Sequence, residues 1–125
     1  SKLIKSGYDV WLGNYRGTSY GRNHTYMSPN TRQFWKFSFD DLYQYDVPAT
    51  IDYVLGVTGQ SKLNWVGFSL GNTGLIGALS LFPKYNDKIN AAVAMAPAVY
   101  FGDTKSPLVR LVTPIQRAYE VCTDT

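Results

Sequence analysis

Residues 67–71 of the sequence read Gly-Phe-Ser-Leu-Gly, which is the pattern G-x-S-x-G. The apolar run before it, residues 63–66, predicts a short buried strand, and residues 72–82 have the apolar spacing of a helix. A strand that passes into a helix through so few residues must turn sharply, so Ser69 at the apex is expected to have strained backbone angles and an exposed side chain. The pattern therefore predicts a nucleophile elbow, with Ser69 as the attacking group.

The residues around Ser69 suit the same chemistry. Leu70 would begin the helix, and its backbone N–H, at the positive end of the helix dipole, could stabilise a developing oxyanion. Gly67 and Gly71 lack the Cβ atoms that we expect to collide across the turn. The alternative is a glycine-rich turn whose serine is inert or binds phosphate, but neither G-x-x-x-x-G-K-[ST] nor G-x-G-x-x-G occurs here.

The composition limits the class of protein. A chain of 125 residues can form one small domain. Its net charge is only +3 and its basic residues are scattered, so a nucleic-acid partner is not expected. No apolar run approaches the roughly 18 residues of a membrane span. Cys122 is the only cysteine, which excludes a disulfide within the chain.

Both ends suggest that flanking chain of the same protein is missing. Ser1 is not an initiator methionine, and no signal-peptide pattern precedes the first structured residues. Residues 106–119 carry an apolar stripe with nothing evident to cover it. We therefore expect this chain to be a segment of a larger protein.

The order of elements predicts an α/β fold. Residues 8–12 and 89–96 are typical of strands on either side of the predicted central strand. Ser38 and Asp41 have the spacing of a capping box at the start of a helix, which Pro48 should kink or divide. The pattern strand, helix, strand, helix, strand predicts a parallel sheet with helices on both faces. The G-x-S-x-G turn would then lie at the carboxyl end of the middle strand, where open α/β sheets bind ligands.

A long loop rich in Gly, Asn, Ser and Tyr is predicted for residues 13–32, and loops of this length are usually functional or held by their own side chains. Arg16 either anchors the loop by hydrogen bonds to carbonyl groups or is solvated. Asn23 begins the triplet Asn-His-Thr, a candidate N-glycosylation site. His24, the only histidine, is interpreted as an exposed loop residue and not as a catalytic base.

Several stretches occur in one order along the chain: residues 7–14 with Arg16 and Gly17, residues 34–35 with 37–40, residues 45–52, residues 58–60 and residues 94–98. In this order they resemble the acid lipases, a family that includes gastric lipase and lysosomal acid lipase. Members usually read Gly-His-Ser-Gln-Gly at the elbow, so that Phe68 and Leu70 depart from the common pattern. The resemblance implies an α/β-hydrolase fold, with residues 1–98 forming a partial core and residues 99–125 the start of the cap.

The resemblance also implies a function: hydrolysis of neutral lipid esters such as triacylglycerols or steryl esters by a secreted or lysosomal enzyme, without a metal or an organic cofactor. Ser69 matches the family's acyl-accepting serine, and Leu70 matches the residue whose N–H serves the oxyanion hole. The catalytic acid and histidine would follow Thr125 and the second oxyanion donor would precede Ser1, so this segment alone is expected to be inactive. The alternatives are an inactive lipase-like protein that binds or stores lipid, and a short-chain esterase.

Overall fold

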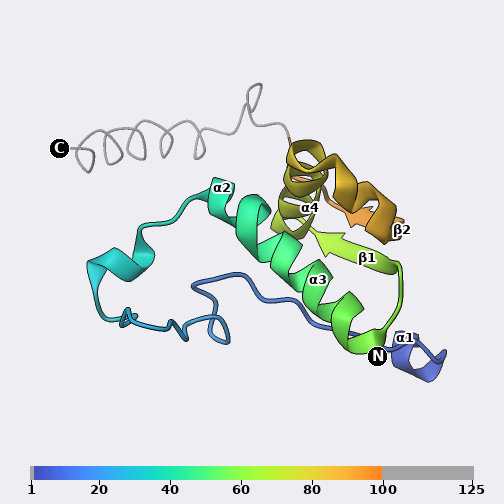
Figure 1. The fold of residues 1–125 in the computed structure, drawn as a ribbon, viewed down its shortest axis with the longest axis horizontal. Coiled ribbons are helices and arrows are strands. Elements are labelled where there is room, and N and C mark those ends of the chain that lie inside the picture. The colour runs from blue at the N-terminus through green and yellow to red at the C-terminus, as the bar shows by residue number, and fades with distance from the viewer. Residues whose placement is uncertain (1, 100–125) are drawn as a thin grey trace.

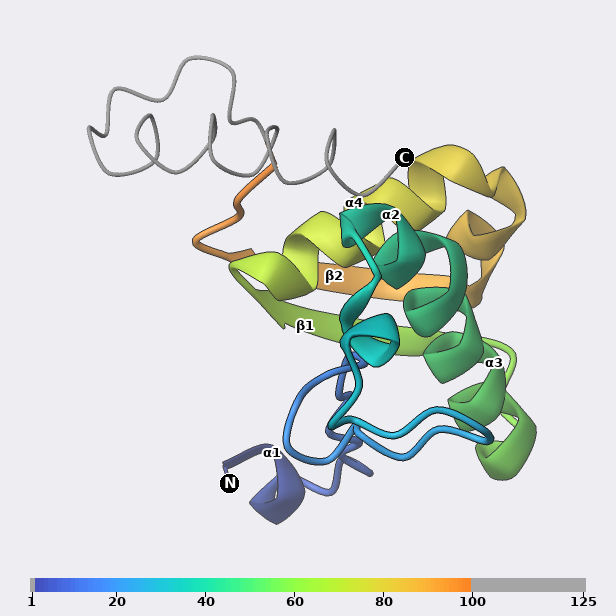
Figure 2. The same ribbon diagram turned by 90° about the vertical axis from the view of Figure 1, so that its left-hand side faces the viewer.

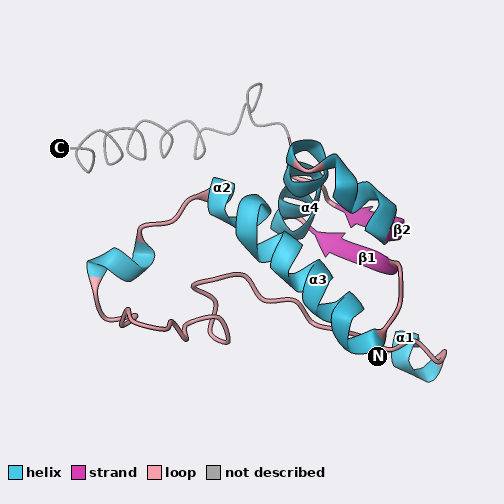
Figure 3. Cartoon of the chain, viewed as in Figure 1, coloured by secondary structure: helices cyan, strands magenta, loops and turns pink. Residues whose placement is uncertain are grey.

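The computed structural model describes residues 2–99 (Figure 1). Figure 3 distinguishes the helices, the strands and the long predicted loop by colour. Residues 100–125, which include Cys122 and most of the predicted cap, lie outside the described residues. The elements are α1 (Lys2–Lys5), the 3-10 helix η1 (Arg32–Trp35), α2 (Phe39–Asp41), the π-helix η2 (Leu42–Asp46), α3 (Val47–Thr58), β1 (Leu63–Phe68), α4 (Leu70–Leu81), the 3-10 helix η3 (Pro83–Lys88) and β2 (Ile89–Met95).

The two strands form a parallel pair, which confirms the strands predicted on either side of the helix after Ser69. Val66 lies opposite Val93, and Phe68 lies opposite Met95. Parallel neighbours must be joined by a crossover. Here α4 and η3 make it, and Figure 2 shows α4 running across one face of the pair. The predicted α/β arrangement is thus present around the G-x-S-x-G turn.

The two faces of this sheet differ in burial. Leu63 and Trp65 are half-buried and pack against the core, and Gly67 is fully buried. The opposite face carries apolar side chains that remain exposed in the part of the chain that the structure describes: Val66 (54%), Phe68 (69%), Val93 (53%) and Met95 (47%). Within residues 2–99 helices therefore cover one face, whereas the sequence predicted helices on both.

The strand predicted for residues 8–12 is wrong for the described structure, where this stretch has no regular secondary structure. Leu12 is 86% exposed, and the Trp11 Nε1 donates to the carboxylate of Asp9 at 2.9 Å. The sheet of residues 2–99 contains only β1 and β2, so no strand offers this stretch a hydrogen-bonded ladder. A high β propensity does not make a strand without such a partner, because the preference reflects packing in a sheet.

The helix before β1 is divided as predicted. Ser38 and Asp41 form the capping box, in which the Ser38 N–H donates to the Asp41 carboxylate at 2.8 Å. Pro48 lacks the N–H that would continue α-helical hydrogen bonding, and the turn before it widens into η2. In η2 the Val47 N–H donates to the carbonyl of Leu42, five residues earlier. Proline therefore separates α2 and η2 from the regular helix α3.

Small residues on α4 bring it close to α3 and to the long loop. A Cβ on Gly74 would overlap the Tyr15 hydroxyl and lie 3.1 Å from a methyl group of Val47. The core that results joins α3, α4 and η3 and comprises Val47, Ile51, Leu75, Ala78 and Tyr85.

Gly74→Ala is expected to lower the free energy of unfolding by about 1–3 kcal/mol, because the added methyl group overpacks the contact with Tyr15 and Val47. Gly56→Ala is the matched control, since Gly56 lies in α3 and a Cβ there would meet no atom within 4 Å. That substitution should stabilise the protein by about 0.5–1 kcal/mol through helix propensity. Urea denaturation of both variants measures the difference, and equal stabilities would contradict this packing.

Tyr15→Phe is expected to raise the free energy of unfolding by about 1 kcal/mol at neutral pH, because the Tyr15 hydroxyl is buried and has no hydrogen-bond partner among residues 2–99. Burial, together with the negative charge of Asp46, raises the pKa of Tyr15 to about 12. The folded state thus favours the neutral phenol. The free energy of unfolding therefore falls as the pH rises from about 10 towards 12. Tyr15→Phe should flatten this alkaline loss of stability, whereas Tyr20→Phe, at an 87% exposed position, should not.

Candidate active site

Ser69 lies at the turn between β1 and α4 and has φ 49° and ψ −112°. A positive φ is uncommon for a residue with a side chain. Within residues 2–99 it occurs at only one other non-glycine residue, Ala96, directly after β2. The strained turn that the sequence predicted is therefore present, but the serine at its apex is half-buried and not exposed as expected.

The backbone of Ser69 is held by hydrogen bonds on both sides, but its hydroxyl does not cap the helix. Its N–H donates to the carbonyl of Met95 at 3.0 Å, and its carbonyl accepts the Asn72 N–H, also at 3.0 Å. Ser69 occupies the N-cap position of α4, where a serine side chain usually accepts a backbone N–H, yet no side-chain cap bond is made. The usual structural role of a serine at this position does not account for Ser69.

Leu70 is the first residue of α4. Its N–H therefore has no carbonyl acceptor within the helix, and it lies at the positive end of the helix dipole. This is the position expected for a donor to an oxyanion formed next to Ser69. The role in catalysis stays a prediction.

The two elbow glycines differ in their surroundings. Gly67 is buried, and a Cβ there would overlap the side-chain oxygen of Asn72 and lie 3.0 Å from Trp65 Nε1. A Cβ on Gly71 would meet no described atom within 4 Å. The expected steric reason for a glycine thus holds at position 67, and it is wrong at position 71 for the part of the chain that the structure describes.

Asn72 is a site residue that the sequence reasoning missed. It is 2% exposed and is the only polar side chain among the buried residues of the described chain. A signal was available, because Asn72 falls three residues before Leu75 and seven before Leu79, in the stripe predicted to face the core. A polar residue in such a stripe needs a hydrogen-bond partner.

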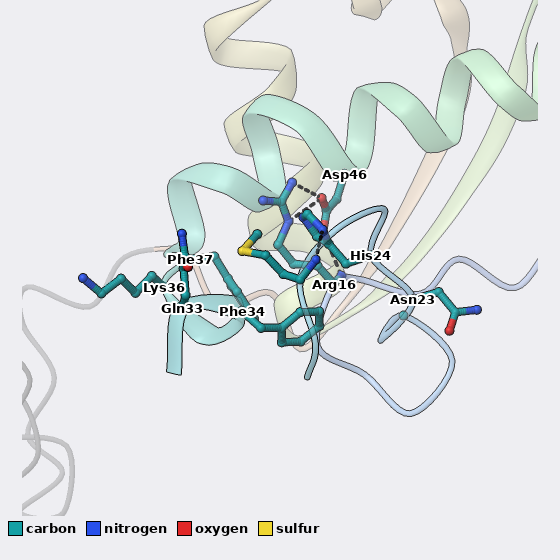
Figure 4. A pocket seen from close by; sticks show the side chains of 10 residues that line it. Arg16, Asn23, His24, Gln33, Phe34, Lys36, Phe37 and Asp46 are labelled. Atoms are coloured by element: carbon teal, nitrogen blue, oxygen red, sulfur yellow. Dashed lines mark hydrogen bonds and ion pairs between the residues drawn. The ribbon is translucent and has the colours of Figure 1, made fainter. Parts of the chain in front are cut away.

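Arg16 anchors the long loop, although its partners are carboxylates and not the carbonyl groups considered from the sequence. Its Nε donates to Asp46 at 2.8 Å and its Nη2 lies 2.6 Å from the same carboxylate (Figure 4). The Arg16 backbone N–H donates to the other Asp46 oxygen at 2.9 Å, and Nη1 lies 3.3 Å from Asp41. The loop is thereby fixed to the start of the helical segment.

A cavity of about 260 Å³ lies beside this ion pair, away from Ser69, which does not line it (Figure 4). The exposed His24 uses Nδ1 to accept the N–H groups of Tyr26 at 3.3 Å and Met27 at 3.2 Å, which confirms its interpretation as a loop residue. Asn23 is also exposed. The lining residues are Arg16, Gly21, Asn23, His24, Met27, Gln33, Phe34, Lys36, Phe37 and Asp46.

In residues 2–99, no group of three or more His, Cys, Asp or Glu side chains could hold a metal ion. Nor does this part of the chain contain a helix with the length and apolar character needed to cross a membrane.

The sequence matches the family model described as alpha/beta hydrolase fold over residues 1–117. This chain belongs to that family. The strand, strained serine turn and helix described above agree with the fold.

Within this class, several relatives are named as lipases. A Schizosaccharomyces pombe protein named as a probable lipase is 51% identical over 96 residues, covering 77% of this chain and 22% of the relative. Human lipase member K is 43% identical over 119 residues (95% and 30%), and bovine gastric triacylglycerol lipase is 47% identical over 104 residues (83% and 26%). The chain thus spans less than a third of the length of these relatives. The resemblance to the acid lipases is confirmed.

Proposed function

We propose that the protein containing this chain is a serine ester hydrolase of the acid lipase type, with Ser69 as its nucleophile. The observation that carries this proposal is the Ser69 turn, which is strained and leaves the hydroxyl without a capping bond. Strained residues persist where the surrounding structure holds them, and they gather at active sites. Membership of the α/β-hydrolase family supports the same reading, because its nucleophile lies on a turn of this kind.

In the proposed mechanism, Ser69 Oγ attacks the carbonyl carbon of an ester while a histidine takes its proton. The negative charge that forms on the carbonyl oxygen accepts a hydrogen bond from the Leu70 N–H. The alcohol leaves with the proton from the histidine, and water then hydrolyses the acyl-serine to release the acid. As the resemblance to acid lipases implies, the histidine, its acidic partner and a second oxyanion donor would come from outside these 125 residues. His24 is engaged in its own loop.

We propose neutral lipid esters, triacylglycerols or steryl esters, as the substrates. Support comes from the relatives, one of which is named as a triacylglycerol lipase. We further propose that the protein is secreted or lysosomal and that Asn23 is glycosylated. Its exposure on a loop would allow a sugar to be attached.

A fluorophosphonate probe tests the proposal on the full-length protein encoded by the gene. We expect a covalent adduct on the tryptic peptide that contains Ser69, and faster hydrolysis of a long-chain triacylglycerol emulsion than of a water-soluble acetate ester. The 125-residue segment alone should turn over neither substrate. Absence of an adduct at Ser69 would favour a lipid-binding or storage protein, and a preference for the soluble ester would indicate a short-chain esterase.

A further inference from the structure

We propose that Asn72 is a positioning residue that fixes the Ser69 turn against the end of β2. The effect on catalysis rests on the proposed function. The hydrogen bonds that hold the turn are those of the structure.

The side chain of Asn72 has a defined partner. Its Nδ2 donates to the main-chain carbonyl of Met95, the last residue of β2, at 2.9 Å. Because the side chain is only 2% exposed, water cannot replace this bond readily. Loss of the donor would remove this hydrogen bond between α4 and the end of β2.

The same residue is linked to both backbone groups of Ser69. The Met95 carbonyl that accepts Asn72 Nδ2 also accepts the Ser69 N–H, at 3.0 Å. The Asn72 N–H donates to the Ser69 carbonyl, at 3.0 Å. Ser69, Met95 and Asn72 thus close a ring of hydrogen bonds around the strained residue. A strained conformation persists only when such contacts over-determine it.

Gly67 completes this arrangement from the other side of the turn. The Asn72 side-chain oxygen occupies the space that a Cβ on Gly67 would need. The first glycine of G-x-S-x-G therefore makes room for Asn72 as well as for the turn itself. Thr73, the next residue after Asn72 on α4, also holds the helix near the end of β2. Its Oγ1 donates to the carbonyl of Ala98, beyond β2.

This geometry predicts a particular kinetic effect. Without the Asn72 amide, α4 stays packed through Leu75 and Ala78, but its first turn is held less tightly to β2. The Ser69 hydroxyl and the Leu70 N–H would then move relative to each other, which weakens stabilisation of the transition state more than binding of the ester. Asn72 would thereby act through Ser69 without touching the substrate.

The test compares Asn72→Ala and Asn72→Asp in the full-length protein, the second of which keeps the shape of the side chain while replacing the donor with an acceptor. For each variant we expect kcat on an ester to fall ten- to a hundredfold, with KM within twofold of the wild-type value. Hydrogen–deuterium exchange of the peptide spanning residues 67–73 should be at least tenfold faster. If one variant fails to fold, the other alone tests the positioning role of Asn72.

Ala78→Gly is the control. Ala78 is buried on the same helix but lies nine residues after Ser69, so the substitution lowers stability away from the Ser69 turn. It should lower the melting temperature but leave kcat and exchange at residues 67–73 near wild type. If the Asn72 variants behave like this control, the positioning role is overturned while the proposed function stands. If the wild-type protein forms no adduct at Ser69, the proposed function fails, and the exchange measurement still decides whether Asn72 holds the turn.

Discussion

Ser69→Ala is expected to lower kcat for ester hydrolysis by the full-length protein by about 10⁴- to 10⁶-fold. In the proposed mechanism the hydroxyl oxygen forms the acyl-enzyme, so its removal abolishes the covalent route and leaves only the contributions of substrate binding and the oxyanion donor. Alanine has the same backbone restriction as serine at φ 49°, and the hydroxyl makes no capping bond to α4. The melting temperature should therefore change little. Initial rates on an ester, with the melting temperature as the check on folding, measure both effects.

Ser80→Ala is the matched control for this substitution. Ser80 is an exposed serine on the same helix α4, and its replacement should leave the rate and the fluorophosphonate adduct unchanged. A Ser69→Ala protein that keeps more than a tenth of the wild-type rate would show that another residue is the nucleophile. A large fall in melting temperature would instead assign Ser69 a structural role.

Arg16→Ala is expected to lower the free energy of unfolding by about 2–3 kcal/mol. The Asp46 side chain is only 12% exposed and would lose its contacts with Arg16 Nε at 2.8 Å and Nη2 at 2.6 Å. A partly buried carboxylate without its cation is costly, and the Arg16 backbone N–H alone cannot compensate for it. The contact with Asp41 adds little, because that side chain is 32% exposed and the distance is 3.3 Å. Chemical denaturation of the full-length protein measures the loss.

Lys62→Ala provides the comparison, since Lys62 is an exposed cation one residue before β1 and its removal should change stability by less than about 0.5 kcal/mol. A double-mutant cycle with Asp46→Ala should give a coupling energy above about 1 kcal/mol, because both side chains belong to one network. A coupling energy near zero would mean that Arg16 stabilises the loop through its aliphatic stem or its contact with the Tyr45 ring, 5.6 Å away.

Local chemistry accounts for the features that the sequence predicted correctly. The turn at Ser69, the Ser38 capping box and the division of the helix before Pro48 each depend on a few neighbouring residues. Glycine, proline and capping residues constrain the backbone wherever they occur, so their effects can be read without the fold. The resemblance to acid lipases, carried by such short motifs, was available for the same reason.

The features that the sequence did not predict depend on contacts between distant parts of the chain. Residues 8–12 have a strand-like sequence but no strand beside them in the described structure, and Arg16 binds a carboxylate 30 residues away. The role that we propose for Asn72 depends on β2, which brings the carbonyl of Met95, 23 residues later in the sequence, to the Asn72 side chain. Thus the sequence by itself determined where the chain turns and which serine is at the apex. Only the tertiary structure decided what holds that serine in place, because hydrogen-bond partners across a fold are chosen by topology and not by neighbouring residues.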